Sequence, residues 1–212
     1  MKSWLECRKI VYSDMVIRKT KSMQWKEYNM GIEIEKKFTV KEIPFNLEAY
    51  PYHEIEQGYL NVHPAIRVRR EDDNYYMTYK GTPFDDKTHD NGIGQVEYNM
   101  PLDQISYEHM SAKADGNMIR KRRYLIPINE DAFSKEYLDK DIQLKEAVSK
   151  GEIKIELDVF KAPFEGRMLA EVEFPSEEAA SNYNPAKWFF EDVTGDRRYS
   201  NSQMSLENIQ EK

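Results

Sequence analysis

The sequence predicts an all-β protein with peripheral helices, built from about eight strands that are mostly antiparallel. Two observations support this fold class. Eight segments alternate apolar and polar side chains with a period of two, which is typical of a half-buried strand. The breaks between several of these segments are short, and short connections favour antiparallel pairing because parallel strands need long crossovers.

The expected strands follow one another from residue 31 onward. Residues 31–40 alternate along their whole length, and His63-Pro64 separates the second strand from the third. The fourth strand ends at Gly81, and residues 82–91 form a polar loop. The expected strands cover residues 31–40, 54–62, 65–71, 74–81, 94–102, 117–128, 152–160 and 167–175.

Helical spacing or capping residues mark three further regions. Asp103 is expected to cap a short helix that runs to about Lys113. In residues 129–151 apolar side chains recur at helical spacing before Gly151, which predicts one helix or a pair. Ser176 is expected to open another helix, and Pro185 a last one.

The charge distribution divides the chain near Met30. Residues 1–29 contain seven Lys or Arg residues and three acids, with no clear period. Three interpretations remain open: a flexible arm, a partner-binding segment, or translated sequence upstream of a true start at Met30. We expect residues 30–205 to form the folded domain, with a helical insertion at about 129–151 and a tail at 206–212.

Composition and charge exclude several classes of protein. The chain is 40% hydrophobic, which is enough for a core and argues against wholesale disorder. Its net charge of −7 argues against a broad nucleic-acid surface, and the single Cys7 excludes a disulfide framework. No apolar run approaches the ~18 residues of a membrane span, and no apolar signal region opens the chain. We therefore expect a cytoplasmic protein.

Most strands place two charged side chains on one face, because residues i and i+2 of a strand share a face. One interpretation is an ordinary sheet with a solvated face. The other is a site for a polyanion and a metal, since Arg binds phosphate bidentately and carboxylates bind hard cations such as Mg²⁺ or Mn²⁺. The pairs are Glu33 with Glu35, Arg67 with Arg69, Lys121 with Arg123, Glu156 with Asp158, and Glu171 with Glu173.

The sequence contains no other recognisable device for binding phosphate. It has neither the GxxxxGK[ST] nor the GxGxxG pattern, so side chains rather than a glycine-rich backbone must contact any phosphate. It also lacks HExxH, and its four histidines are scattered. A zinc-hydrolase site is therefore not predicted.

Residues 33–37, Glu-Ile-Glu-Lys-Lys, match the ExExK signature of the CYTH superfamily, the triphosphate tunnel metalloenzymes, and residues 30 to about 204 resemble this family. Supporting motifs follow in order: Gln57-Gly58-Tyr59-Leu60, Arg67-Val68-Arg69, Tyr79-Lys80-Gly81, Lys121-x-Arg123-Tyr124, Glu156-Leu157-Asp158, Ala170-Glu171-Val172-Glu173 and Val193-Thr194-Gly195-Asp196. The resemblance implies an eight-stranded antiparallel closed β-barrel with a charged lumen. Its apolar faces would look outward, under helices at 103–113, 130–150 and 176–192, whereas elementary packing arguments alone would turn them inward.

The resemblance also implies roles for individual residues. The implied metal ligands for Mg²⁺ or Mn²⁺ are Glu33, Glu35, Asp158, Glu171 and Glu173. The implied phosphate contacts are Lys37, Arg67, Arg69, Lys80, Lys121, Arg123 and Arg198. Lys37, Arg67 and Asp158 are implied to act in catalysis, and Glu97 and Glu156 to support the lining. Gln95 and Asn99 depart from positions that are commonly charged in the family.

The leading functional hypothesis is a metal-dependent inorganic triphosphatase, which cleaves tripolyphosphate to pyrophosphate and phosphate by two-metal activation of water. Three alternatives remain: a class IV-like adenylate cyclase, a thiamine triphosphatase, and a non-enzymatic polyphosphate-binding module. Cyclases of this family tend to carry a His-Phe pair before ExExK, where this chain has Tyr28-Asn29. The expected partner is a small triphosphate, with no nucleic acid or membrane, and a homodimer is the default assembly to test.

Overall fold

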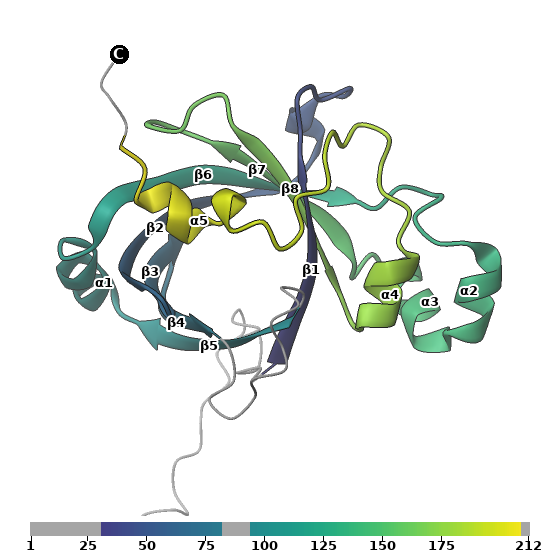
Figure 1. The fold of residues 1–212 in the computed structure, drawn as a ribbon, viewed down its shortest axis with the longest axis horizontal. Helices are drawn as coiled ribbons and strands as arrows, with labels where there is room; N and C mark the ends of the chain where they lie inside the picture. The colour runs from purple at the N-terminus through teal and green to yellow at the C-terminus, as the bar shows by residue number, and fades with distance from the viewer. Residues whose placement is uncertain (1–30, 82–93, 209–212) are drawn as a thin grey trace, which may run out of the picture.

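A computed structural model describes residues 31–81 and 94–208, so the predictions for residues 1–29 and for the loop at 82–91 fall outside the described residues. Figure 1 shows a strongly curled sheet with helices on its outside. The strands are β1 (Gly31–Thr39), β2 (Tyr52–Val62), β3 (Ala65–Glu71), β4 (Asn74–Gly81), β5 (Gly94–Leu102), β6 (Asp115–Pro127), β7 (Lys154–Phe160) and β8 (Met168–Phe174). The α-helices are α1 (Gln104–Ser111), α2 (Lys135–Lys140), α3 (Ile142–Ser149), α4 (Glu177–Asn182) and α5 (Asn201–Ser205), and the 3₁₀ turns are η1 (Leu47–Ala49) and η2 (Arg197–Tyr199).

The eight strands pair antiparallel throughout, which confirms the predicted sheet. Their hydrogen-bonded order is β1-β5-β4-β3-β2-β6-β7-β8. The first strand, β1, pairs with β5 over residues 31–34 and with β8 over residues 34–39. Consecutive strands from β2 to β5 are neighbours, as their short connections predict.

The apolar face of the sheet lies under the helices, as the family resemblance implies. Phe38, Ile155, Leu157 and Val172 are all at most 2% exposed on this outer face. They belong to one core cluster with residues from α3 and α4. Figure 1 shows α2, α3 and α4 grouped beside β1, β7 and β8. The opposite, inner face of the sheet is therefore the one that carries the charged couplets.

The segment at 129–151 forms the helix pair α2 and α3 and contributes to this outer core. Leu144 of α3 is 0% exposed, whereas Ile142 on the same helix is 68% exposed. Asp141 caps α3 by accepting a hydrogen bond from the backbone nitrogen of Leu144 at 2.9 Å.

Replacing Leu144 with alanine should lower the free energy of unfolding by about 2–5 kcal/mol, because it leaves a cavity in a closed core. For a chain of this size that corresponds to a fall in Tm of roughly 4–20 °C. Thermal unfolding followed by circular dichroism measures the change, and Ile142→Ala is the matched control. Equal Tm values for the two variants would contradict the described packing.

Two of the predicted helix starts are confirmed, and one prediction is wrong. Asp103 caps α1 through a 2.7 Å hydrogen bond from the nitrogen of Ser106, and Ser176 caps α4 in the same way. Residues 185–192 form no α-helix. Their backbone instead pairs with β1. The Phe190 nitrogen donates to the Thr39 carbonyl, and the Thr39 nitrogen donates to the Glu191 carbonyl, both at 2.9 Å. These hydrogen bonds replace the ones that a helix would have made.

Among the described residues, no helix combines the length and the apolar character that crossing a membrane requires.

Candidate active site

The inner face of the sheet gathers charged side chains from seven strands. Because the strands are antiparallel and side chains alternate, residues at every second position of neighbouring strands meet on this face. The register places Lys37 of β1 opposite Glu171 of β8, Lys80 of β4 opposite Glu97 of β5, and Arg123 of β6 opposite Asp158 of β7. The contacts divide these residues into two groups, which differ in how completely their charges are paired.

The first group, here called the β6–β8 network, comprises Lys37, Lys121, Arg123, Glu156, Asp158 and Glu171. Arg123 is its centre. Its Nε lies 2.7 Å from Asp158 Oδ1, and its Nη2 lies 2.8 Å from Asp158 Oδ2 and 2.6 Å from Glu171 Oε2. Its Nη1 also donates to Glu156. One guanidinium thus contacts three carboxylates, so its positive charge is compensated within the protein.

Two lysines complete the β6–β8 network. The ammonium of Lys121 contacts Asp158, and both side chains are 0% exposed. The Lys37 ammonium lies 2.9 Å from Glu171 Oε1 and 3.4 Å from Glu35 Oε1. Every one of these charges has an opposite partner, which a buried charge requires.

The pKa values in this network follow from burial and pairing. Burial alone would raise the pKa of Asp158, but Arg123 and Lys121 outweigh it and lower that pKa. Burial would likewise raise the pKa of Glu171, but Lys37 and Arg123 hold it well below its usual range. Burial, reinforced by repulsion from Arg123, lowers the pKa of Lys121 to about 8 despite its contact with Asp158. Both carboxyl groups are therefore ionised at neutral pH.

The second group, here called the β3–β5 group, comprises Glu33 of β1 with Arg67, Lys80, Glu97 and Asn99. Lys80 forms an ion pair with Glu33, whereas Arg67 Nη2 lies 3.8 Å from Glu97 Oε2, too far for a hydrogen bond. Two buried atoms of this group, Arg67 Nε and Glu97 Oε2, make no hydrogen bond, whereas Glu33 Oε2 is the atom that pairs with Lys80. Buried polar atoms in a native protein normally have such partners. The β3–β5 group therefore retains donors and acceptors that suit a polar ligand.

Asn99 occupies a commonly charged family position, and in the structure it hydrogen-bonds to Glu97 and Thr78. Its amide nitrogen donates to Glu97 Oε1 at 2.8 Å, and its amide oxygen accepts from Thr78 Oγ1 at 2.6 Å. Although burial opposes it, Arg67, Lys80 and this amide together lower the pKa of Glu97. The neutral Asn99 thus holds Glu97 in place without adding a charge. The side chain of Gln95 lies outside the described residues.

Comparison with known proteins identifies relatives that cover most of the chain. No family model matches the chain. An inorganic triphosphatase of Nitrosomonas europaea is 32% identical over 178 residues, which cover 82% of this chain and 97% of that protein. A second, of Acetivibrio thermocellus, is 30% identical over 179 residues, which cover 82% of this chain and 94% of that protein.

The chain belongs to the inorganic triphosphatase family. The crystal structure of the inorganic triphosphatase NE1496 is similar to it, with a TM-score of 0.55 and 28% identity. That similarity covers 84% of this chain and 97% of the solved one. The family identification agrees with the CYTH resemblance carried by the sequence motifs, and members of this tunnel fold generally depend on a divalent metal.

The ligand types on the inner face of this triphosphatase relative fit a hard divalent cation. Glu33 and Glu35 lie two residues apart on β1, and Glu173 of β8 stands directly opposite Glu35. Like charges in directly opposed positions repel, and a bound cation would relieve that repulsion. Within the described residues, no three Asp, Glu, His or Cys side chains converge closely enough to hold a metal. Glu33 and Glu35 face Lys80 and Lys37 instead.

Arg198 is the predicted site residue that the structure does not bring to the inner-face groups. Its side chain is 84% exposed, and its guanidinium pairs with Asp196 two residues earlier, at 2.6 Å. Asp196 also caps η2 by accepting from the backbone nitrogen of Arg198. A phosphate contact by Arg198 stays a prediction, and it would require this local pair to open.

Sequence reasoning missed the polar residues that hold Arg69. Gln57 and Tyr76 both contact its guanidinium, and Glu71 accepts from the Tyr76 hydroxyl at 2.5 Å. The available signal was positional, because Tyr76 shares a strand face with Lys80, Glu71 shares one with Arg69, and Gln57 belongs to the Gln57-Gly58-Tyr59-Leu60 motif. Gln57 and Tyr76 are neutral, so a pattern of paired charges does not include them.

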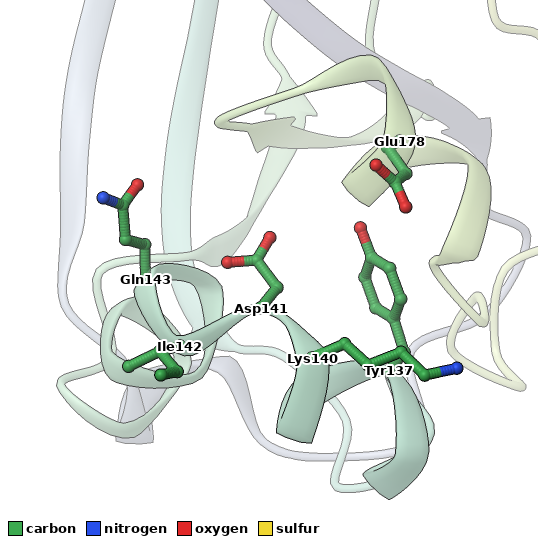
Figure 2. Close-up of a pocket in the computed structure, with 6 residues that line it drawn as sticks. All are labelled: Tyr137, Lys140, Asp141, Ile142, Gln143 and Glu178. Carbon is green, nitrogen blue, oxygen red and sulfur yellow. The ribbon is translucent and has the colours of Figure 1, made fainter.

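A surface pocket of about 360 Å³ lies outside the sheet, between α2, α3 and α4 (Figure 2). Its lining consists of Tyr137, Lys140, Asp141, Ile142, Gln143 and Glu178. None of the predicted site residues lines it. The insertion at 129–151 thus packs on the outer face, away from the charged inner face.

Proposed function

We propose that this protein hydrolyses inorganic tripolyphosphate to pyrophosphate and phosphate, with Mg²⁺ or Mn²⁺ as cofactor. The supporting observation is the inner face itself, where bases and carboxylates from seven strands meet in a member of the inorganic triphosphatase family. A pure binding module for polyphosphate would need bases more than opposed carboxylates. The abundance of acids therefore favours a metal-assisted hydrolase.

We further infer that the curled sheet acts as a closed tunnel. The support is that β1 pairs on one side with β5 and on the other with β8, which joins the two ends of the strand order. In a closed sheet of eight strands the interior is narrow and lined by side chains. A narrow, poorly hydrated interior strengthens the electrostatic interactions on which phosphoryl transfer depends.

The residue roles that we propose follow the division into two groups. In the β3–β5 group, Arg67 and Lys80 bind phosphate oxygens, because their site retains unbonded polar atoms. In the β6–β8 network, Asp158 and Glu156 orient Arg123, and Lys37 contacts the substrate from β1. Lys121 and Arg69 complete the basic lining. The carboxylates of Glu33, Glu35, Glu171 and Glu173 would hold the divalent cation.

When bound, the cation would supply charge neutralisation on phosphate oxygens and a water of lowered pKa. The protein's own contribution is positioning and electrostatic stabilisation. Arg67 and Lys80 would fix the phosphate chain and stabilise the charge that develops on the leaving pyrophosphate. Arg123 is paired with three carboxylates, so a phosphate contact by this residue would require one of these pairs to open. For Asp158, its contacts with Arg123 and Lys121 support an orienting role more strongly than an open ligand position.

The decisive experiment compares substrates in parallel. Phosphate release is measured from tripolyphosphate, ATP and thiamine triphosphate with Mg²⁺ or Mn²⁺, and cyclic AMP is followed in the ATP reactions. The proposal predicts fastest release from tripolyphosphate with no cyclic AMP. Cyclic AMP with pyrophosphate would establish a cyclase instead, and fastest release from thiamine triphosphate would change the assigned substrate. Tight tripolyphosphate binding without turnover would favour the binding module.

Replacing Arg67 with alanine should raise the KM for tripolyphosphate by about tenfold or more, because a charged hydrogen-bond donor to substrate is lost. Initial-rate kinetics measure this effect. Arg120→Ala serves as the matched control, because that arginine is paired with Glu56 and its side chain is 48% exposed. Unchanged KM and kcat in Arg67→Ala would exclude a substrate contact.

A further inference from the structure

A chain of buried polar side chains crosses β2 and β3 on the inner face. Gln57 of β2 is 0% exposed. Its amide nitrogen donates to the Tyr59 hydroxyl at 3.0 Å, and its amide oxygen accepts from Arg69 Nε at 2.8 Å. Gln57 stands directly opposite Arg69 in the register of the two strands, so the backbone itself brings the amide to the guanidinium.

The other edge of the Arg69 guanidinium is held from β4. Tyr76 stands opposite Arg69 in the β3–β4 register, and its hydroxyl accepts from Arg69 Nη1 at 3.2 Å. The same hydroxyl donates to Glu71 Oε2. In the described part of the chain, no hydrogen bond to another residue engages Arg69 Nη2. A guanidinium fixed at two of its three nitrogens therefore still offers the third.

The partners of Arg69 differ in kind from those of Arg123. Arg123 donates to three carboxylates, which neutralise its charge. Arg69 donates to an amide and a phenol, and no ion pair within the described residues includes it. The Glu71 carboxylate, which accepts from the Tyr76 hydroxyl, attracts Arg69 through space without a direct contact, and, although burial opposes it, Arg69 lowers the pKa of Glu71. The Arg69 side chain is nonetheless buried, with the residue only 7% exposed. A buried cation that is oriented by neutral groups keeps its charge available to an anionic ligand.

We propose that Gln57 is a positioning residue that holds Arg69, without neutralising it, for contact with a phosphate group of the substrate. The proposal rests on the proposed function for the identity of the ligand. It explains why an amide stands here. Glutamate would have the same shape but would form an ion pair with Arg69, and an aliphatic side chain would leave Arg69 Nε without a partner.

The test is the variant Gln57→Glu, because glutamate preserves the contacts and changes only the charge. Its carboxylate can accept from Arg69 Nε and from the Tyr59 hydroxyl, so we expect the Tm to be maintained. Binding of tripolyphosphate, measured by isothermal titration calorimetry, should weaken about tenfold or more. In turnover assays the KM should rise by a similar factor while kcat changes less, because the contact holds bound substrate. A merely structural role would not separate binding from Tm in this way.

Two further variants make the test specific. In an Arg69→Met background, Gln57→Glu should no longer weaken binding, because the side chain through which it acts is gone. Gln143→Glu on α3 adds the same charge at an exposed position and should bind tripolyphosphate like the unmodified protein.

The outcomes separate this inference from the proposed function. Binding by Gln57→Glu at the unmodified affinity, or an equal loss in the Arg69→Met background, would overturn the positioning role alone. An unmodified protein that binds tripolyphosphate but does not hydrolyse it would refute the proposed activity, while the binding comparison would still decide the role of Gln57.

Discussion

Replacing Glu33 with glutamine should reduce the kcat/KM for tripolyphosphate by at least about 100-fold while leaving the fold intact. The reason lies in the ligand chemistry, because a neutral amide is a much poorer ligand than a carboxylate for a hard divalent cation. Glutamine is almost the same size as glutamate, so no cavity forms. Loss of the ion pair with Lys80, whose side chain is 21% exposed, should lower the free energy of unfolding by less than the loss of a partner from the fully buried Asp158 pair.

Two measurements check the Glu33→Gln prediction. Phosphate release at saturating Mn²⁺ gives the activity, and titration of Mn²⁺ by calorimetry gives metal binding independently of turnover. Glu42→Gln, an exposed position just beyond β1, is the matched control and should behave like the unmodified protein. If Glu33→Gln retained full activity and full Mn²⁺ affinity, the assignment of the inner face as a metal site would be refuted.

Replacing Asp158 with asparagine should lower the free energy of unfolding at pH 7 by about 3–5 kcal/mol, the cost of removing one partner from a buried ion pair. Asp158 is 0% exposed and contacts both Arg123 and Lys121, so the variant leaves two buried cations with less compensation. Denaturant unfolding measures this loss. Activity should also fall, because Arg123 loses the carboxylate that fixes its Nε and Nη2.

The difference in free energy of unfolding between the unmodified protein and Asp158→Asn should depend on pH. Folding lowers the pKa of Asp158. The stabilisation that its charge provides is therefore present above the pKa of the unfolded chain, about 3.9, and is lost as the pH falls through the pKa of the folded protein. The stability difference between the unmodified protein and Asp158→Asn should therefore narrow below about pH 4. A difference that stayed constant down to pH 2 would mean that the charge of Asp158 contributes nothing to the fold.

Much of the fold followed from local patterns in the sequence. The alternation in residues 65–71, 74–81 and 94–102 gave the bounds of three strands as they occur, because a half-buried strand repeats every two residues. Capping at Asp103 and Ser176 is equally local. Residues 185–192 failed as a helix prediction, since long-range pairing of their backbone with β1 outweighs the local signal of Pro185.

The site was predictable in its residue types but not in its pairings. Alternation shows that Arg67 and Arg69 share a face, yet it says nothing about which side chains stand opposite them. That depends on strand register, which gives Arg69 the neutral partners Gln57 and Tyr76. Arg198 shows the same limit, because its contact with Asp196 depends on the local geometry of a turn rather than on a sequence motif.

Residues 190–194, which follow the last strand, hydrogen-bond to one edge of β1. The Thr194 hydroxyl accepts from the backbone nitrogen of Lys37 at 3.0 Å, and Val193 donates to the carbonyl of Lys37 at 2.9 Å. Residues 190–194 include no predicted site residue, yet they hydrogen-bond to the strand that carries the ExExK signature. A protein shortened to residue 189 would keep all eight strands but release one edge of β1. Minimal versions of this catalyst should therefore extend beyond the last strand.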